Sequence, residues 1–132
     1  MNIVYKETKI FAPKELEGLF LSVEWASGHY PERLVVAMKN SGSVFSAWNN
    51  EQLIGLINVL DDGIMTAYVH YLLVHPQHQG KGIGRELVRL VSEKYKDYLR
   101  IVLVAYNKGV DFYTSCGFTA GIEKTPMFLT SI

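Results

Sequence analysis

The chain has 132 residues, of which 48% are hydrophobic and 20% charged, a balance typical of a globular protein and not of a disordered one. Thirteen basic and thirteen acidic side chains give a formal net charge of zero, so no basic surface for nucleic acid is indicated. The length predicts a single domain, residues 1–132. No apolar run reaches the roughly 18 residues that cross a bilayer, and no leader-like segment begins the chain, so we expect a cytoplasmic protein without membrane partners.

Strand and helix patterns alternate in the first third of the chain. Residues 3–10 carry the apolar and β-branched side chains of a strand. A helix is predicted from Pro13, because the apolar residues after it recur at helical spacing: Leu16, Leu19, Phe20 and Val23. A loop over residues 25–30 follows, and a second helix is predicted over residues 31–38.

The middle of the chain is predicted to be an antiparallel meander. Strands are expected over residues 44–48, over 53–60 and from residue 64 or 65 to residue 74. The turn between the last two contains Asp61-Asp62-Gly63, and an Asp-Gly pair tolerates the positive φ of a hairpin turn. Consecutive strands joined this way pair antiparallel.

The pattern then changes to strand, helix, strand. A helix beginning near Ile83 has one apolar face, made of Ile83, Leu87, Leu90 and Val91. The dense apolar run 100–105 is typical of a central strand, parallel to the preceding one because a helix connects them. A short helix over residues 110–116 should end at Gly117, and the lone Cys116 is expected to be a small buried residue at the end of this helix and not a nucleophile. One cysteine excludes an internal disulfide and a cysteine-rich metal site.

The chain is predicted to end in a hairpin of residues 118–120 and 127–129 around Pro126. Its apolar residues offer a surface on which two copies could pair as a homodimer.

The loop after the third meander strand contains three alternate glycines, Gly80, Gly82 and Gly84. Such a loop exposes backbone N–H groups, and the helix behind it adds unpaired amides and a positive dipole end, so it predicts a seat for a diphosphate. A dinucleotide fingerprint would need glycine at Arg85, and a Walker loop would need Ser or Thr at Gly82, so both are excluded. An ordinary strand-to-helix turn without a ligand is the alternative.

Two segments resemble those of the GNAT superfamily of N-acetyltransferases. The first is Gln79-x-x-Gly82-x-Gly84 after Val74-x-Pro76, similar to the acetyl-CoA pyrophosphate loop of that family. The second, residues 107–118, has Asn, then Phe-Tyr, then Gly-Phe in the family's order. The resemblance implies the α/β GNAT fold: a mixed central sheet with an antiparallel N-terminal meander, parallel fourth and fifth strands splayed to bind CoA, and flanking helices. It also implies acetyl-CoA as cosubstrate and no metal.

By this resemblance, the cofactor contacts fall on two adjoining segments and on the second motif. The segments are the strand end that pairs with the pantetheine arm and the loop that holds the diphosphate, and the expected contacts are Leu72, Leu73, Val74, Gln79, Gly80, Lys81, Gly82, Ile83, Gly84, Arg85, Asn107 and Tyr113. The N–H of Leu73 is the expected donor to the oxyanion of the reaction.

Tyr113 is the predicted general acid, because a phenol with a pKa near 10 can deliver a proton to a leaving thiolate whose thiol has a pKa near 8.5. Its alternative is an aromatic side chain that only packs. Many family members have a catalytic Glu where this chain has Tyr68; members acting on arylalkylamines place a histidine at the position of His70, which is the predicted base. A structural histidine is the alternative there. Strand alternation predicts Tyr68 and His70 on one face, with Val69 and Tyr71 on the other.

The acceptor site is predicted opposite the cofactor. Its expected contributors are aromatic, histidine and carboxylate side chains: Trp25, His29, Tyr30, Trp48, Tyr68, His70 and either Asp61 or Asp62. Core packing is the alternative for most of them. His75 and His78 are expected to be solvated or close to phosphates, and they form no metal site, because no third ligand recurs with them.

The predicted activity is direct transfer of an acetyl group from acetyl-CoA to a primary amine of a small molecule or a protein. Two alternatives remain open: an enzyme using another acyl-CoA, and a CoA-binding sensor of the same fold without turnover.

Overall fold

A computed structural model describes residues 2–132, and its centre is one mixed sheet with the strands in sequence order, β1-β2-β3-β4-β5. The strands are β1 (Ile3–Glu7), β2 (Ser43–Asn49), β3 (Gln52–Asp61), β4 (Thr66–Val74) and β5 (Arg100–Leu103). Strands β1 to β4 pair antiparallel, and β5 pairs parallel to β4. The meander and the parallel pair predicted from the sequence are therefore confirmed.

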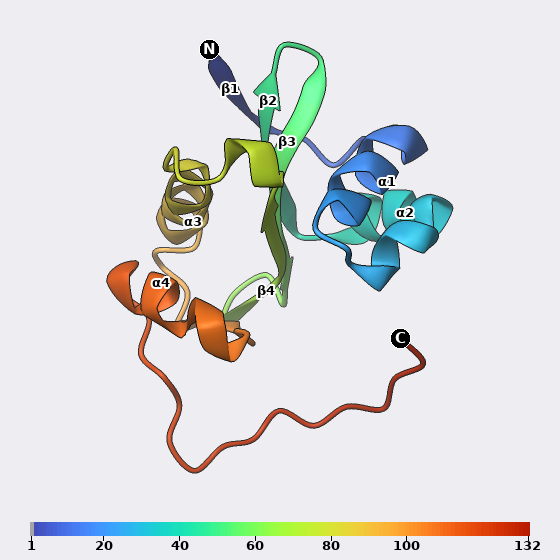
Figure 1. The fold of residues 1–132 in the computed structure, drawn as a ribbon. Helices are drawn as coiled ribbons and strands as arrows, with labels where there is room; N and C mark the ends of the chain where they lie inside the picture. Colours follow the sequence, from blue (N-terminus) through green and yellow to red (C-terminus); the bar gives the residue numbers. More distant parts are fainter. Residues whose placement is uncertain (1) are drawn as a thin grey trace.

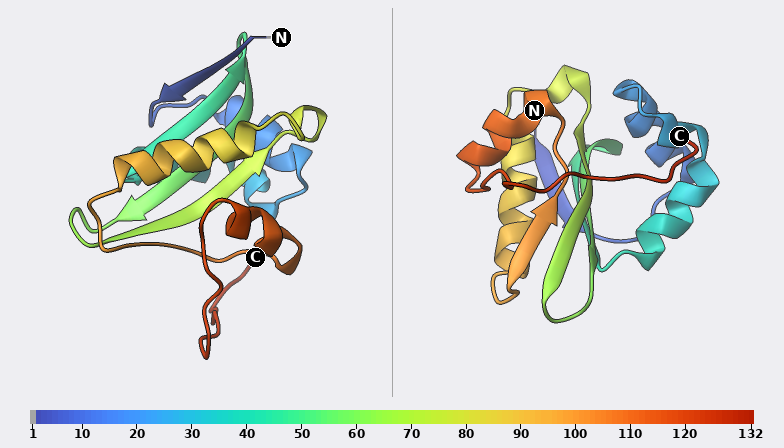
Figure 2. Two further views of the ribbon diagram at one scale, coloured as in Figure 1. Left: turned by 90° about the vertical axis from the view of Figure 1, so that its left-hand side faces the viewer. Right: turned by 90° about the horizontal axis from the view of Figure 1, so that it is seen from below.

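Helices cover both faces of the sheet (Figure 1). The longer ones are α1 (Pro13–Ser22), α2 (Pro31–Asn40) and α3 (Ile83–Lys94), and α4 (Val110–Ser115) is short. Three 3-10 turns connect elements: η1 (Ala26–His29), η2 (Pro76–His78) and η3 (Asn107–Gly109). Helices α1 and α2 lie on one face and α3 on the other, so the sheet is the middle of three layers (Figures 1 and 2).

Each face of the sheet carries its own hydrophobic core. On the α3 side, Ile57 and Val69 pack with Ile83 and Leu87 of the helix. On the other side, a second core is built from α1, α2 and the sheet, and its fully buried members include Leu16, Phe20, Met38 and Leu56. The apolar helix faces predicted from residue spacing are the faces that are buried.

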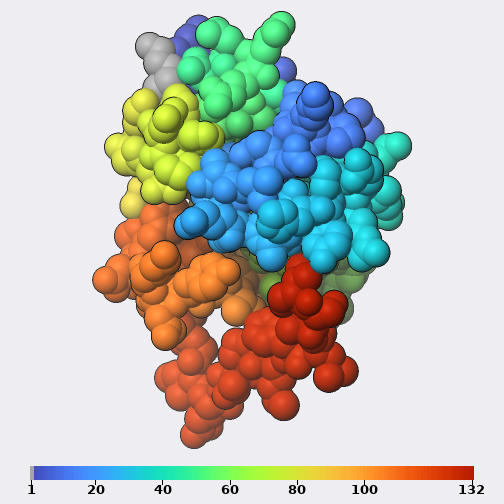
Figure 3. All heavy atoms as spheres, turned by 45° about the vertical axis from the view of Figure 1, so that its right-hand side comes forward, coloured from blue at the N-terminus to red at the C-terminus, as the bar shows by residue number. Residues whose placement is uncertain are grey.

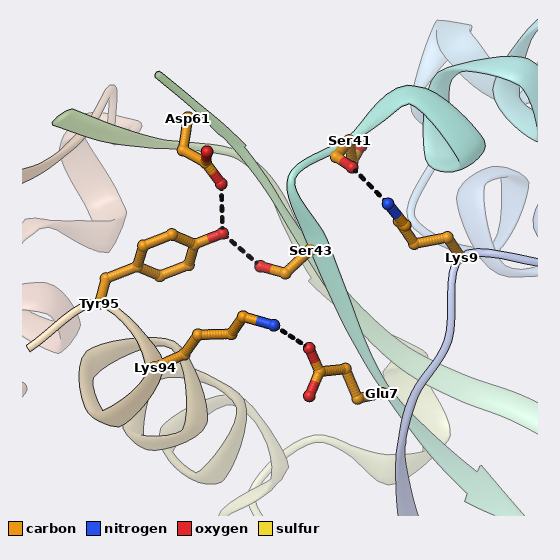
Figure 4. A network of polar contacts seen from close by, with 7 residues as sticks. All are labelled: Glu7, Lys9, Ser41, Ser43, Asp61, Lys94 and Tyr95. Atoms are coloured by element: carbon orange, nitrogen blue, oxygen red, sulfur yellow. Dashed lines mark hydrogen bonds and ion pairs between the residues drawn. The ribbon is translucent and has the colours of Figure 1, made fainter. Parts of the chain in front are cut away.

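A polar network fixes the end of α3 to the sheet (Figure 4). The hydroxyl of Tyr95 donates to Asp61 Oδ2 at 2.7 Å, and Ser43 Oγ lies 2.6 Å from the same hydroxyl oxygen. Lys94 pairs with Glu7 of β1. Tyr95 is 2% exposed, and its burial raises the pKa of its phenol, so the group stays protonated. These contacts tie α3 to three strands.

The predicted C-terminal hairpin is wrong. Residues 118–132 continue as an extended segment without strand pairing, seen below the body of the domain in Figure 3. Glu123 has a φ of +60° and Pro126 lacks an N–H, so the segment bends and loses a ladder donor. A two-stranded hairpin is marginal in water unless another element covers it. The first strand also ends earlier than predicted, at Glu7.

Candidate active site

A β-bulge in β4 marks the centre of the candidate site. In the β3–β4 register, Asn58 faces Tyr71 and Val59 faces Val69, so His70 is the extra residue on β4. The bulge reverses the side-chain alternation: Val69 packs into the α3-side core, whereas Tyr71 packs against the core under α1 and α2. The prediction that Val69 and Tyr71 share a face is therefore wrong.

Asn58 takes over the backbone hydrogen bond that the bulge displaces. Its Oδ1 accepts from the N–H of Tyr71 at 2.9 Å, and its Nδ2 donates to Ser41 Oγ at 3.2 Å. The Ser41 hydroxyl in turn donates to the carbonyl oxygen of Ala37 in α2 at 2.8 Å. Asn58 is 1% exposed. It was not among the predicted site residues, although a polar residue inside the apolar run 53–60 indicates a buried hydrogen-bonding role. We infer that Asn58 positions the bulge.

Asn58→Leu should destabilise the fold by about 1–3 kcal/mol, because the Tyr71 N–H loses its buried acceptor. Urea unfolding measures the change. Asn40→Leu, at the exposed end of α2, is the control and should stay within about 0.5 kcal/mol of the parent. Equal stability of the Asn58 and Asn40 variants would contradict the positioning role.

Beyond the bulge, β4 has an open edge. In the described part of the chain, β5 pairs with β4 only from Thr66 to Val69, so the remaining residues of β4 have no strand neighbour on that side. Leu103, the partner of Val69, is also the last residue of β5, so the chain leaves the sheet there and the splay that the resemblance implies stays a prediction. A peptide-like arm can pair with the free backbone groups as an added strand.

The direction of the N–H groups on this edge follows from two hydrogen bonds. The Tyr71 N–H donates to Asn58 and the His75 N–H to the carbonyl oxygen of Ile54 at 2.8 Å, both toward β3. N–H groups alternate along a strand, so the Leu73 N–H also points toward β3. The Leu73 donor prediction is therefore wrong, and its side chain is 4% exposed in the core.

Leu72 and Val74 present their N–H groups to the open edge by the same alternation. They lie within the triplet predicted to contact the pantetheine arm, and their side chains pack against the α3-side core. The open edge therefore offers two donors about two residues apart, about 7 Å along the strand.

The glycine loop has the backbone expected of an anion seat. Gly80 and Gly82 have φ of +79° and +82°, and a Cβ at either would meet nothing within 4 Å, so both face open space. The first hydrogen bond of α3 runs from the Glu86 N–H to the Gly82 carbonyl oxygen at 3.0 Å. The N–H groups of residues 83–85 therefore precede the helical pattern and are available to a diphosphate. This geometry fits the predicted ligand.

Gln79 closes the loop, and its side chain acts within the protein. Its Nε2 donates to the carbonyl oxygen of Val74 at 3.0 Å, so the loop is tied to the end of β4. Lys81 is exposed at the tip of the loop. His78, which precedes Gln79, is only 8% exposed, so of its two expected surroundings, solvent or a phosphate, burial excludes solvent and leaves the phosphate as a prediction.

Arg85 joins the glycine loop to α4. Its Nη2 donates to Ser115 Oγ at 2.9 Å, and its guanidinium lies 5.8 Å from the centre of the Phe112 ring. The same ring would be 3.4 Å from a Cβ on Gly84, so a larger residue there would crowd α4. The Arg85 guanidinium is thus engaged with α4, which differs from the predicted phosphate contact, and it holds α4 against the start of α3.

Tyr113 lies on α4, the helix that Arg85 holds against the start of α3. Its ring is half-buried between Phe112 and Phe118, at centroid distances of 5.2 and 5.9 Å. Burial raises the pKa of its phenol above 10, and the nearby Cys116 raises it further. The phenol therefore carries its proton at neutral pH, the state that an acid needs.

An aromatic cluster surrounds Tyr71, which packs against the core on the face of the sheet that α1 and α2 cover. His70 stacks on Tyr71 at 4.1 Å, and its ring is 5.8 Å from Tyr68. Tyr71 lies 5.9 Å from Trp25, which is 6.3 Å from Tyr106. His70 is exposed on β4, and partial desolvation of its ring lowers the pKa of the imidazole, which is therefore neutral at pH 7. Tyr71 and Tyr106 were not among the predicted site residues.

Other predicted acceptor residues lie elsewhere. Trp48 is 6% exposed, stacks on Phe11 and donates to Ser46, so it belongs to the core. Asp61 accepts from Tyr95, and the Asp62 carboxylate caps the β3–β4 turn, where backbone N–H groups led by that of Met65 lower its pKa. Asp61 is the last residue of β3, paired with Ala67, and Asp62 follows it in the turn, so the structure brings neither carboxylate to the bulge at His70.

Three predicted contacts lie on the surface. Tyr30 is 42% exposed and packs with Arg33, at 5.3 Å from ring centre to guanidinium. His29 is exposed in η1, and Asn107 is exposed at the start of η3. These positions leave their roles as predictions.

Residues 2–132 contain no group of three or more His, Cys, Asp or Glu side chains that could hold a metal ion. None of the helices formed by these residues is long and apolar enough to cross a membrane.

The sequence and the fold are both similar to those of known proteins. A family model described as acetyltransferase (GNAT) domain matches residues 40–120. An uncharacterized N-acetyltransferase of the ycf52-like type from Prochlorococcus marinus is 32% identical over 124 residues, which cover 89% of this chain and 68% of that protein. A histone acetyltransferase of Glycine max is 33% identical over 122 residues, covering 83% of this chain and 52% of its own length.

Among solved structures, a GNAT-family acetyltransferase of Streptococcus pneumoniae superposes with a TM-score of 0.83 and 27% identity, covering 98% of both chains. The chain therefore belongs to the GNAT family of N-acetyltransferases. The family implies an acyl-CoA cosubstrate.

Proposed function

We propose that this domain transfers an acetyl group directly from acetyl-CoA to a primary amine. The observation that carries the proposal is the open edge of β4, which begins at the His70 bulge and runs into the glycine loop. A diphosphate on the loop amides would direct an extended pantetheine arm along this edge toward the bulge. The acyl group would then lie between Tyr113 and His70.

Each step of the transfer has a candidate group. The neutral amine nitrogen attacks the thioester carbonyl carbon, and the N–H of Leu72 or Val74 donates to the oxyanion, an effect of about 3 kcal/mol per donor. The carbon–sulfur bond then breaks, and the leaving thiolate takes the proton of the Tyr113 phenol. No covalent bond to the enzyme is required.

His70 is the proposed base that removes the proton of the amine, directly or through one water. A base must be deprotonated to act, so the rate should fall as the pH drops through its pKa. Because desolvation lowers that pKa, the acidic limb of kcat/KM should have its midpoint below 6.5. His70→Ala should remove this limb, measured as a pH–rate profile, and added imidazole should restore part of the rate. An unchanged limb would contradict the assignment.

The aromatic cluster suggests the character of the acceptor. Trp25, Tyr71 and Tyr106 offer ring faces beside the bulge, and Tyr106 is 67% exposed. Ring faces bind apolar groups and cations. We propose an amine attached to an apolar or aromatic group, either a small molecule or a protein side chain or terminus.

Acetyl-CoA should raise the melting temperature of the protein. At 100 times Kd, the stabilisation of about 2.7 kcal/mol corresponds to roughly 10 °C for a domain of this size. Thermal melts with acetyl-CoA or free CoA, followed by thiol release over a panel of amines, test the proposal in two steps. Absence of a thermal shift would remove it. A shift without thiol release for any amine would favour the CoA-binding sensor.

A further inference from the structure

Helix α4, which carries the proposed acid Tyr113, depends on other elements for its position. It is six residues long, and none of these six residues is buried. A helix this short is unstable by itself in water. Phe112 in it, and Cys116 and Phe118 just beyond it, are half-buried against the α3-side core, next to α3 (Figure 1). A small set of contacts therefore fixes the direction of α4, and with it the direction of the Tyr113 phenol.

One side chain of α3 contacts the end of α4 through two nitrogen atoms. Arg85 Nη2 donates to Ser115 Oγ at 2.9 Å, and Arg85 Nη1 lies 3.4 Å from the Ser115 carbonyl oxygen and 3.8 Å from Cys116 Sγ. The Ser115 hydroxyl donates its own proton to the carbonyl oxygen of Phe112 at 2.6 Å. It thus accepts from α3 and donates within α4. A planar guanidinium reaches two acceptors of one residue at once, whereas a lysine ammonium acts as a single point charge.

Close packing accompanies this polar contact. A Cβ on Gly84 would be 3.4 Å from Cζ of Phe112, and the Arg85 guanidinium lies 5.8 Å from the centre of the same ring. The Phe112 ring in turn lies 5.2 Å from the ring of Tyr113. An unbroken line of contacts therefore runs from the first turn of α3 to the phenol.

The backbone of Arg85 belongs to the proposed seat of the diphosphate. Its N–H is one of those of residues 83–85, which precede the first hydrogen bond of α3, from the Glu86 N–H to the Gly82 carbonyl oxygen. Its side chain extends to Ser115 instead. The same residue therefore joins the cofactor seat, through its N–H, to the helix of the acid, through its guanidinium.

We propose that Arg85 is a positioning residue for the general acid: its side chain holds α4 so that the Tyr113 phenol reaches the leaving sulfur of a cofactor seated on the α3 amides. A misplacement of about 1 Å can cost about 100-fold in rate, so an exposed contact that adds little to stability can matter for kcat. The inference rests on the proposed function, because it concerns the same site.

Arg85→Gln should lower kcat by about 10- to 100-fold, with Kd for CoA changed by less than about threefold and Tm by less than about 3 °C. Arg85→Lys keeps the charge but loses the second donor, so kcat should stay low. Arg89→Gln, one turn further along α3 and paired with Glu86 at 2.6 Å, is the matched control and should keep parental kcat. Parental kcat in either Arg85 variant would overturn the proposal; weaker CoA binding alone would then identify Arg85 as a phosphate contact.

Double variants test whether Arg85 acts through α4. Ser115→Ala should lower kcat about as much as Arg85→Gln, and combining the two should cost little more. In a Tyr113→Phe background, Arg85→Gln should have no further effect, because the group that it positions is absent. Thr114→Ala is the control, since Thr114 Oγ1 donates to the Val110 carbonyl oxygen at 2.8 Å within α4. Losses that multiply in the double variants would overturn the proposal.

Hydrogen exchange tests the Arg85–Ser115 contact without turnover. The N–H groups of Cys116, Gly117 and Phe118 donate to carbonyl oxygens of α4. Arg85→Gln should speed their exchange by about fivefold relative to the parent and to Arg89→Gln, because α4 opens more often. Equal exchange rates would overturn the proposal. A parent that releases no thiol with any amine would contradict the proposed function instead, so the two failures are distinguishable.

Discussion

Tyr113→Phe should lower kcat by about 10²–10⁴-fold, the usual contribution of a positioned general acid. The substitution removes only the hydroxyl, and the ring can keep its contacts with Phe112 and Phe118. The affinity for acetyl-CoA should therefore change little. Thiol release at saturating substrates measures kcat, and calorimetric titration with CoA measures Kd.

Tyr5→Phe is the matched control for this variant. Tyr5 lies on β1, at the edge of the sheet away from β5, and its phenol pKa is also raised by burial. Its loss should leave kcat unchanged. A general acid must be protonated to act. Because the pKa of Tyr113 is raised above 10, the parent enzyme should stay active as the pH rises, until the pH exceeds that pKa. A Tyr113→Phe enzyme with parental kcat would end the acid assignment.

Gly82→Ala should weaken binding of acetyl-CoA by tenfold or more, about 1.4 kcal/mol. A Cβ at Gly82 would project into the open space in front of the loop, where the diphosphate is proposed to bind. The backbone, with φ of +82°, would also be strained by about 1–2 kcal/mol. The titration with CoA and a urea melt separate the two effects.

Gly63→Ala provides the control for strain. Gly63 has a φ of +84° and also meets nothing within 4 Å, but it lies in the β3–β4 turn, away from the glycine loop. The two variants should lose similar stability, and only Gly82→Ala should lose CoA affinity. Equal affinities for CoA in the two variants would contradict a diphosphate seat at the loop.

Local patterns in the sequence predicted the parts of this fold that depend on neighbouring residues. The glycines of the loop, the Asp-Gly turn and the apolar faces of the helices act within a few residues of their own positions. Their conformations are therefore readable without the rest of the chain. The GNAT motifs at residues 74–84 and 107–118 have the same local character, and the family they indicated is confirmed.

Only the folded chain shows which groups face the open edge. The bulge at His70 depends on Asn58, on Ser41 and through it on α2, contacts that join residues far apart in sequence. One extra residue in a strand reverses every later side chain, so alternation counted from Tyr68 failed at Tyr71. The pairing of β4 with β3 likewise directs the Leu73 N–H toward β3 and away from the open edge. The sequence by itself thus determined the types of residue at the site. The directions of their side chains and N–H groups were decided by the pairing of distant strands, because the two-residue period of a strand does not reveal where its register shifts.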